Sequence, residues 1–318
     1  MRIARVQHQD EPRTAVVIDD RVAVLEAGVR VLDLLSADPD PRARLADRID
    51  AERALSDVEL LAPIEPPTFR DFSVFEAHIE GVIKTGGDPD APVPPVWYER
   101  PYCYFSNPYA ITGPGEEIKM APGTQAQDLE LEVAAVIGRA GRHLRPEVAA
   151  EHIAGFTIWN DWSARDIGGK EVQTPFGQCK GKDFANTLGP WIVTPDELEP
   201  FRDGDRYALG LQATINGAPL GDGDTLANMA WSFAEMVAYA SHGTWVRPGD
   251  VLGSGTCQNG CLLELWGRNG SFSDPPPLQP GDEVSLSVEG IGTLTNRLVE
   301  GEPVIHLPAA RPGSRSAR

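Results

Sequence analysis

The sequence has few cysteines, few basic residues and no long apolar run, and each shortage excludes a class of protein. Four cysteines in 318 residues are too few and too irregularly spaced for a disulfide framework or a zinc site. The pair Cys257 and Cys261 is therefore interpreted as two reduced, small apolar residues, in preference to a ligand pair.

Basic residues are scarce relative to acidic ones. Lysine and arginine total 28 against 47 aspartates and glutamates, a formal net charge of −19, which disfavours nucleic acid and membrane surfaces as partners. No segment approaches the ~20 consecutive apolar residues of a membrane-spanning helix, and no signal-peptide core follows Met1. We therefore expect a cytoplasmic protein.

Two adjacent prolines, Pro66 and Pro67, indicate a linker, because neither helix nor sheet pairing tolerates them. We predict a small N-terminal β domain at residues 1–63, a main domain at 67–310 and a frayed tail at 311–318. In the first domain, strands are predicted at 2–7, 15–18 and 21–25, and a helical or loosely ordered segment at 42–61.

The main domain reads as mostly β with a few helices, an α+β fold. A hairpin is predicted at 209–220, where Asn216 and Gly217 suit a type I′ turn. The other predicted elements are strands at 126–138, 155–160 and 190–194, paired strands within 282–299, a helix at 226–241 and a loop at 86–101.

Three acidic residues alternate along one predicted strand. Asp128, Glu130 and Glu132 would share a face, which is also typical of a solvated strand surface. The strand continues as Val133-Ala134-Ala135-Val136-Ile137, which is apolar on both faces and so indicates burial. Carboxylates entering a buried strand must be neutralised by protonation, by cations or by a metal.

Other candidate residues are ambiguous when taken singly. Asp161 lies between Trp159 and Trp162, where an aspartate also serves as a helix cap or turn former. Lys182 lies in a glycine-containing turn of the kind usually found at the surface, and a lone histidine such as His78 is more often structural.

Taken together and in order, these segments resemble the fumarylacetoacetate hydrolase family over roughly residues 71–299. The resemblance rests on the combined order and spacing of five segments, namely Asp71-Phe72 with His78, Asp128-Leu129-Glu130-Leu131-Glu132, Asn160-Asp161-Trp162-Ser163-Ala164-Arg165-Asp166, Gly181-Lys182-Asp183-Phe184 with Gly189-Pro190-Trp191, and Gly253-Ser254-Gly255-Thr256 with Leu263-Glu264.

The resemblance implies a metal site and the residues that act beside it. Glu130, Glu132 and Asp161, with Asp71, would bind a divalent cation, Mg²⁺ first, with Mn²⁺ or Ca²⁺ as alternatives. The catalytic residues it implies are His78 as the base for water, Lys182 as the stabiliser of negative charge, and Glu264 as the residue that orients His78. It also implies a homodimer, and a rolled mixed β-sandwich preceded by a small N-terminal β-barrel.

Several substrate-contact positions are also implied. Thr256 and Tyr104 are expected to contact substrate. Fumarylacetoacetate hydrolase has tyrosine, glutamine and tyrosine where this chain has Ser73, Gly168 and Val172, so we expect the family's chemistry on a different substrate.

The implied reaction is cleavage of a C–C bond in a β-diketo acid by activated water. A hard cation can carry the developing enolate charge, and histidine exchanges protons near neutral pH. Two other possibilities remain open on the same residues. One is decarboxylation of a 2-oxo acid such as oxaloacetate, or isomerisation or tautomerisation of a dienedioate; the other is a non-catalytic paralogue that retains the fold.

Overall fold

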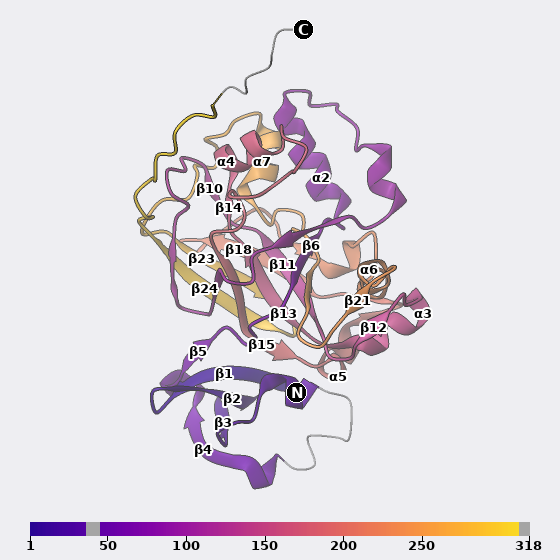
Figure 1. The fold of residues 1–318 in the computed structure, drawn as a ribbon, viewed down its shortest axis with the longest axis vertical. Coiled ribbons are helices and arrows are strands. Elements are labelled where there is room, and N and C mark those ends of the chain that lie inside the picture. Colours follow the sequence, from indigo (N-terminus) through magenta and orange to yellow (C-terminus); the bar gives the residue numbers. More distant parts are fainter. Residues whose placement is uncertain (36–44, 312–318) are drawn as a thin grey trace.

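The computed structural model describes residues 1–35 and 45–311 and places most strands in two sheets (Figure 1). The larger sheet comprises β1 (Arg2–His8), β2 (Glu11–Ile18), β3 (Arg21–Leu25), β4 (Ile49–Ala54), β5 (Glu59–Leu61), β6 (Phe69–Phe72), β7 (Cys103–Ser106), β8 (Ile111–Thr112), β11 (Leu131–Ile137), β13 (Ile153–Asp161), β15 (Asn186–Val193) and β22 (Val251–Gly253). The second sheet comprises β9 (Glu117–Lys119), β18 (Gly210–Ile215), β19 (Ala218–Pro219), β20 (Asp224–Thr225), β23 (Glu283–Val288) and β24 (Gly292–Val299).

Short strand pairs and helices lie between the strands of these sheets along the chain. The two-stranded pairs are β10 (Gln127–Asp128) with β14 (Ser163–Ala164), β12 (Gly141–Arg142) with β21 (Trp245–Val246), and β16 (Arg202–Asp203) with β17 (Arg206–Tyr207). The α-helices of the described ranges are α1 (Val31–Leu35), α2 (Glu76–Ile83), α3 (Pro146–Ala149), α4 (Arg165–Glu171), α5 (Pro195–Leu198), α6 (Phe233–Ala240) and α7 (Leu262–Asn269). Short 3₁₀ helices lie at Ala46–Arg48, Leu55–Asp57, Lys84–Gly86, Pro95–Glu99, Ala150–His152, Glu199–Phe201 and Leu226–Asn228. The mostly β, α+β prediction is confirmed.

The N-terminal strands extend the larger sheet and do not close into a barrel, so the expectation of an N-terminal β-barrel was wrong. β1 pairs antiparallel with β15, with Arg2 opposite Val193, and the order continues outward as β2, β3 and β4. Figure 1 shows these strands as the lower layer of the molecule. The strands predicted at 2–7, 15–18 and 21–25 are confirmed as β1, β2 and β3.

The prediction for residues 42–61 was wrong over most of the segment that the structure describes. β4 and β5 occupy residues 49–54 and 59–61, because pairing with β3 and β1 overrides the local Ala/Leu-rich composition. Residues 42–44 lie outside the described residues, as does all of the expected tail at 311–318 except Arg311. The boundary at 63–67 remains a proposal, since strands on both sides of it belong to one sheet.

The centre of the larger sheet is buried on both faces, as the run 133–137 predicted. Val133, Ala135 and Ile137 pack into the core shared with the second sheet. Ala134 and Val136 pack on the opposite face, in the cluster that includes helix α1. This strand, β11, therefore has no solvent-facing side.

Several predicted elements of the main domain are confirmed and two are corrected. The hairpin β18–β19 has positive φ at Asn216 (52°) and Gly217 (79°), and β23 and β24 pair as expected. The strand predicted at 126–138 is interrupted between β10 and β11, at 129–130. The helix predicted at 226–241 begins only at Phe233, because Ser232 and Glu235 form a capping box there.

Helices α2 and α7 cross in direct contact at two glycines. A Cβ on Gly267 would lie 1.9 Å from the Gly81 carbonyl oxygen, and one on Gly81 would lie 2.4 Å from Glu264 Cγ. Figure 1 shows both helices together at the end of the molecule opposite the N-terminal strands. The close approach fixes Glu264 of α7 relative to His78 of α2.

We predict that Gly267→Ala destabilises the protein, by about 1–3 kcal/mol, because the methyl group overlaps a backbone carbonyl that cannot rotate away. The matched control is Gly169→Ala in α4, where the added Cβ meets nothing within 4 Å. That control should gain up to ~1 kcal/mol from helix propensity alone. Urea unfolding measures both, and equal stabilisation of the two variants would contradict the contact.

Candidate metal centre

Four carboxylates meet at one end of neighbouring strands of the larger sheet. The strand order β13-β11-β22-β6 places Asp161 at the end of β13, Glu132 in β11 and Asp71 in β6. Glu130 lies in the break immediately before β11. Register fixes the alignment, since Glu132 pairs with Trp159 and Gly253 pairs with Asp71.

The four side chains form a compact, buried, oxygen-only group. Asp71, Glu130, Glu132 and Asp161 each offer a carboxylate oxygen, and these oxygens all lie within 4.8 Å of one another. Asp71 Oδ1, Glu132 Oε1 and Asp161 Oδ1 are buried without a hydrogen-bond partner. Three unsatisfied oxygens from three strands suit a hard divalent cation such as Mg²⁺, Mn²⁺ or Ca²⁺. The residues present therefore fit the cation that the sequence implied.

Two buried cations partly balance this negative charge. Lys182 Nζ donates to Asp161 Oδ2 at 2.7 Å and also to Glu130 Oε2. Arg165 donates to Glu130 Oε1 at 2.7 Å and to Asp128 Oδ2 at 2.7 Å. Lys182 is placed by the glycine before it, because a Cβ on Gly181 would lie 2.7 Å from the backbone nitrogen of Gly168.

The electrostatics divide the carboxylates into two classes. Burial, followed by the charge of Asp161, raises the pKa of Asp71 well above its usual value, and burial with Asp71 does the same for Glu132. Burial, opposed by Lys182, raises the pKa of Asp161 to about 6. Burial acts in the same sense on Glu130, but Lys182 and Arg165 outweigh it and lower its pKa to about 2. The site therefore needs further positive charge to hold all four groups ionised.

Asp128 does not join this group, although the sequence placed it on the same strand face. The chain turns at 129–130, and Asp128 instead accepts hydrogen bonds from the backbone nitrogens of Leu262 (2.7 Å) and Leu263 (3.0 Å). It thus caps the start of α7 while holding Arg165. A break in strand pairing, invisible in the alternation of residues, separates its role from that of Glu130.

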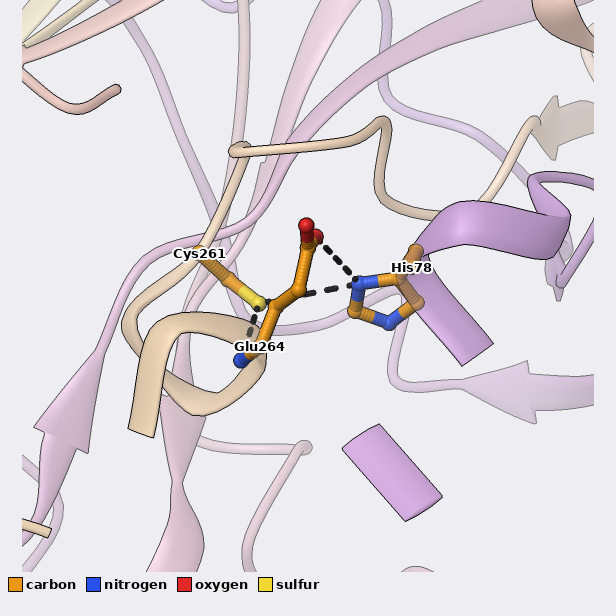
Figure 2. A group of neighbouring side chains, drawn as sticks. All are labelled: His78, Cys261 and Glu264. Carbon is orange, nitrogen blue, oxygen red and sulfur yellow. Dashed lines mark hydrogen bonds and ion pairs between the residues drawn. The ribbon is translucent and has the colours of Figure 1, made fainter. Parts of the chain in front are cut away.

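His78 and Glu264 form a buried pair beside the carboxylates. His78 Nδ1 lies 3.3 Å from Glu264 Oε2, and the other ring nitrogen points away from Glu264 (Figure 2). A carboxylate only accepts, so in the neutral imidazole this contact places the hydrogen on Nδ1 and the lone pair on Nε2. Glu264 is itself fixed by Arg268 at 2.7 Å and by the Asn259 backbone nitrogen at 3.0 Å.

A cavity of about 340 Å³ opens onto both groups. Of the residues expected at the site, it is lined by Asp71, Ser73, His78, Tyr104, Glu130, Lys182 and Thr256. Tyr104 pairs with Asp71 across β6 and β7, and its hydroxyl donates to Asp161 Oδ2. The expected residues thus converge, with Glu132, Asp161 and Glu264 directly behind this lining.

Two expected contact residues lie outside the lining. Gly168 is buried in α4, and Val172 follows that helix with 57% of its surface exposed. Arg165, Gln178, Tyr102 and Leu263 line the cavity instead, although the sequence assigned them no role. Arg165 could have been found from its place four residues after Asp161, whereas Gln178 lies in an irregular segment without a pattern.

Comparison with known families gives two matches that together cover most of the chain. A family model described as "Fumarylacetoacetate (FAA) hydrolase C-terminal" matches residues 68–299, and one described as "Rv2993c-like, N-terminal" matches residues 1–63. Within the described ranges, no helix is both long and apolar enough to span a bilayer.

Individual relatives carry several different activities in their names. The chain is 29% identical to a fumarylacetoacetase of Arabidopsis thaliana, over 78% of this chain and 73% of that protein. It is 30% identical to the oxaloacetate tautomerase YisK of Bacillus subtilis, over 77% of this chain and 74% of that protein.

Similar solved structures also carry different activities in their titles. A 5-carboxymethyl-2-hydroxymuconate delta-isomerase from Mycobacterium smegmatis superposes with a TM-score of 0.69 at 28% identity, covering 94% of this chain and 100% of that one. A fumarylacetoacetate hydrolase from Exiguobacterium antarcticum gives 0.71 at 28% identity, covering 95% and 100%.

We predict that Mg²⁺ raises the melting temperature of metal-stripped protein, because the four carboxylates come together only in the folded state and the ion therefore binds only that state. At a hundredfold excess over its dissociation constant, the gain is about 2.7 kcal/mol. Glu132→Gln should remove most of this gain, whereas Glu117→Gln, at an exposed glutamate of β9, should keep it. Scanning calorimetry with and without Mg²⁺ measures the melting temperature of both variants. An Mg²⁺-induced rise in Glu132→Gln as large as in the wild type would exclude Glu132 as a ligand.

We also predict that metal-free protein loses stability as pH rises from about 4 to about 6. The pKa of Asp161 is raised from 3.8 to about 6, so in this window the folded state retains a proton that the unfolded chain has released. Saturating Mg²⁺ replaces that proton and should abolish the decline.

Urea unfolding across this pH window, with and without Mg²⁺, measures the effect. Asp161→Asn is the control, because it removes one of the titrating groups and should make the metal-free decline shallower. Asp71 and Glu132, whose pKa values are also raised, keep the remainder of the decline. If stability falls with the same slope in the metal-free wild type, the wild type with Mg²⁺ and metal-free Asp161→Asn, then Asp161 does not contribute to the pH dependence of stability.

Proposed function

The chain belongs to the fumarylacetoacetate hydrolase family, and from that premise we propose that it is a divalent-metal-dependent hydrolase that cleaves a C–C bond in a β-diketo acid. The observation that carries the proposal is the convergence of two groups on one cavity. The carboxylate group supplies a cation site, and the His78–Glu264 pair supplies a base held in one orientation.

In this proposal Asp71, Glu130, Glu132 and Asp161 hold the cation, with Mg²⁺ expected first and Mn²⁺ or Ca²⁺ possible. When bound, the cation supplies Lewis-acid stabilisation of the negative charge that develops on a substrate oxygen. Lys182 adds a fixed positive charge, because its ammonium group is buried between Glu130 and Asp161 and lines the cavity.

The base in the proposed reaction is His78 Nε2. It takes a proton from water as the water oxygen bonds to the keto carbon, while Glu264 holds the imidazolium through Nδ1. The bond between that carbon and the adjacent methylene carbon then breaks. Its electron pair leaves with the released fragment as an enolate, which His78 reprotonates, so the two products are carboxylic acids.

Substrate contacts in the proposal come from Ser73, Tyr104 and Thr256, which line the cavity. Gly168 and Val172 do not line it, so Gln178 and Arg165 are the polar side chains of that part of the chain placed to meet a carboxylate or keto oxygen. The family resemblance also leads us to propose a homodimer, which analytical ultracentrifugation tests directly.

Isomerisation or tautomerisation is the second candidate function, favoured by relatives named as an oxaloacetate tautomerase and a muconate isomerase. His78 would then move a proton between two carbons, or between carbon and oxygen, and no water would be consumed. Decarboxylation of a 2-oxo acid needs neither the base nor the water and has less support from the His78–Glu264 pair.

A turnover panel in ¹⁸O-labelled water separates these activities. It contains acylpyruvates, fumarylacetoacetate, sugar-derived diketo acids and oxaloacetate, each with Mg²⁺, Mn²⁺ or EDTA. Hydrolysis gives two acids, one of them carrying the label. Tautomerisation changes the enol absorbance without cleavage, and decarboxylation releases CO₂; either result without labelled acid would overturn the hydrolase proposal.

We predict that His78→Ala lowers kcat by ~10²-fold or more, because the proton acceptor is lost. Metal affinity should stay nearly unchanged, since His78 is not among the four carboxylate residues. His306→Ala, which removes an exposed histidine, is the matched control and should retain full turnover. Wild-type kcat in His78→Ala would remove His78 from the mechanism.

A further inference from the structure

Cys261 is a fully buried thiol beside His78 and Glu264 that the proposed reaction does not use. Its Sγ lies 3.7 Å from His78 Nδ1 and caps α7 by accepting from the Glu264 backbone nitrogen at 3.5 Å (Figure 2). Burial raises the pKa of the Cys261 thiol well above its usual value, which disfavours a nucleophilic or redox role. A coordinated metal, in contrast, deprotonates a thiol outright.

The two separations that involve His78 Nδ1 match tetrahedral coordination. Zinc bonds of roughly 2.3 Å to sulfur and 2.0–2.1 Å to nitrogen or oxygen place sulfur and nitrogen about 3.5 Å apart, and nitrogen and oxygen about 3.3 Å apart. The observed separations are 3.7 Å for Cys261 Sγ to His78 Nδ1 and 3.3 Å for His78 Nδ1 to Glu264 Oε2. Ligand atoms from all three residues lie within 4.8 Å of one another.

The chemistry of the donors separates this group from the carboxylate centre. A thiolate, an imidazole and one carboxylate favour Zn²⁺ or Co²⁺, whereas an oxygen-only group suits Mg²⁺. Glu264 is held from behind by Arg268 and by the Asn259 backbone, as outer partners hold ligands in metal sites. His78 and Leu263 line the cavity, which gives an ion a route to the group.

We propose that His78 Nδ1, Cys261 Sγ and a Glu264 carboxylate oxygen form a second metal site, selective for a thiophilic divalent ion such as Zn²⁺. Binding breaks the S–H bond and releases that proton to solvent, and it moves the imidazole hydrogen from Nδ1 to Nε2. Nε2 then no longer accepts a proton. The ion would therefore inhibit turnover, a consequence that rests on the proposed function of His78, whereas the binding does not.

Cobalt titration of metal-stripped protein tests the binding. One equivalent of Co²⁺ added in saturating Mg²⁺ should produce a thiolate-to-cobalt charge-transfer absorption, which oxygen ligands cannot give. Cys261→Ala should lose this band and His78→Ala should weaken it. Cys179→Ser, which removes the exposed cysteine, is the matched control and should keep it.

Two results would overturn the site: no band in the wild type, or a band that persists in Cys261→Ala. Circular dichroism verifies that Cys261→Ala is folded, and Cys261→Ser provides a second variant closer in size to the native residue. If both cysteine variants unfold, the wild type and His78→Ala still decide, because a band of equal strength in both excludes coordination by His78.

Inhibition is measured separately, as the effect of Zn²⁺ on each variant relative to its own turnover in saturating Mg²⁺. The wild type and Cys179→Ser should be inhibited, and Cys261→Ala should be resistant. A cobalt band without zinc inhibition would leave the site standing and remove His78 as the base. Equal inhibition of the wild type and Cys261→Ala would place the inhibitory ion at the carboxylates.

Discussion

The burial of four like charges at one end of a sheet is the constraint on which the rest of the site depends. Asp71, Glu130, Glu132 and Asp161 lie on or beside three strands of the larger sheet, β6, β11 and β13, with little access to water. Carboxylates in such an environment repel one another and lose their hydration, so they remain ionised only where positive charge is supplied. Lys182 supplies part of it through two ion pairs. The three oxygens left without partners lie where the proposed cation would complete the balance.

The second half of the site is built on different elements, two helices in close contact. Helices α2 and α7 approach until Gly81 and Gly267 touch, and this packing brings Glu264 to 3.3 Å from His78. Asp128 connects the halves, because it holds Arg165 on the carboxylate side and caps the first turn of α7. A change in the packing of α7 would therefore alter the His78–Glu264 distance and would also reach Glu130 through Asp128 and Arg165.

Local patterns in the sequence predicted the elements whose side chains report their surroundings directly. The run 133–137 indicated a strand buried on both faces, and Asn216-Gly217 indicated a tight hairpin; both are present. Predictions failed where long-range pairing or a cap decided the outcome. Residues 49–54 became a strand against β3, and Ser232 delayed the start of α6. The N-terminal strands joined β15 in place of closing into a barrel, which no local pattern reports.

The sequence by itself determined the types of residue available for chemistry: acidic residues entering an apolar strand, an aspartate between tryptophans, and a histidine and lysine at family-like positions. Only the tertiary structure decided which of them meet. Strand register brought Asp71 and Tyr104 to Asp161, while a break at 129–130 sent Asp128 elsewhere. It also placed Cys261, which the sequence showed only as a small apolar residue, against His78. The physical reason is that proximity between residues far apart in the chain is set by sheet order and helix packing, which sum many weak contacts that no single segment encodes.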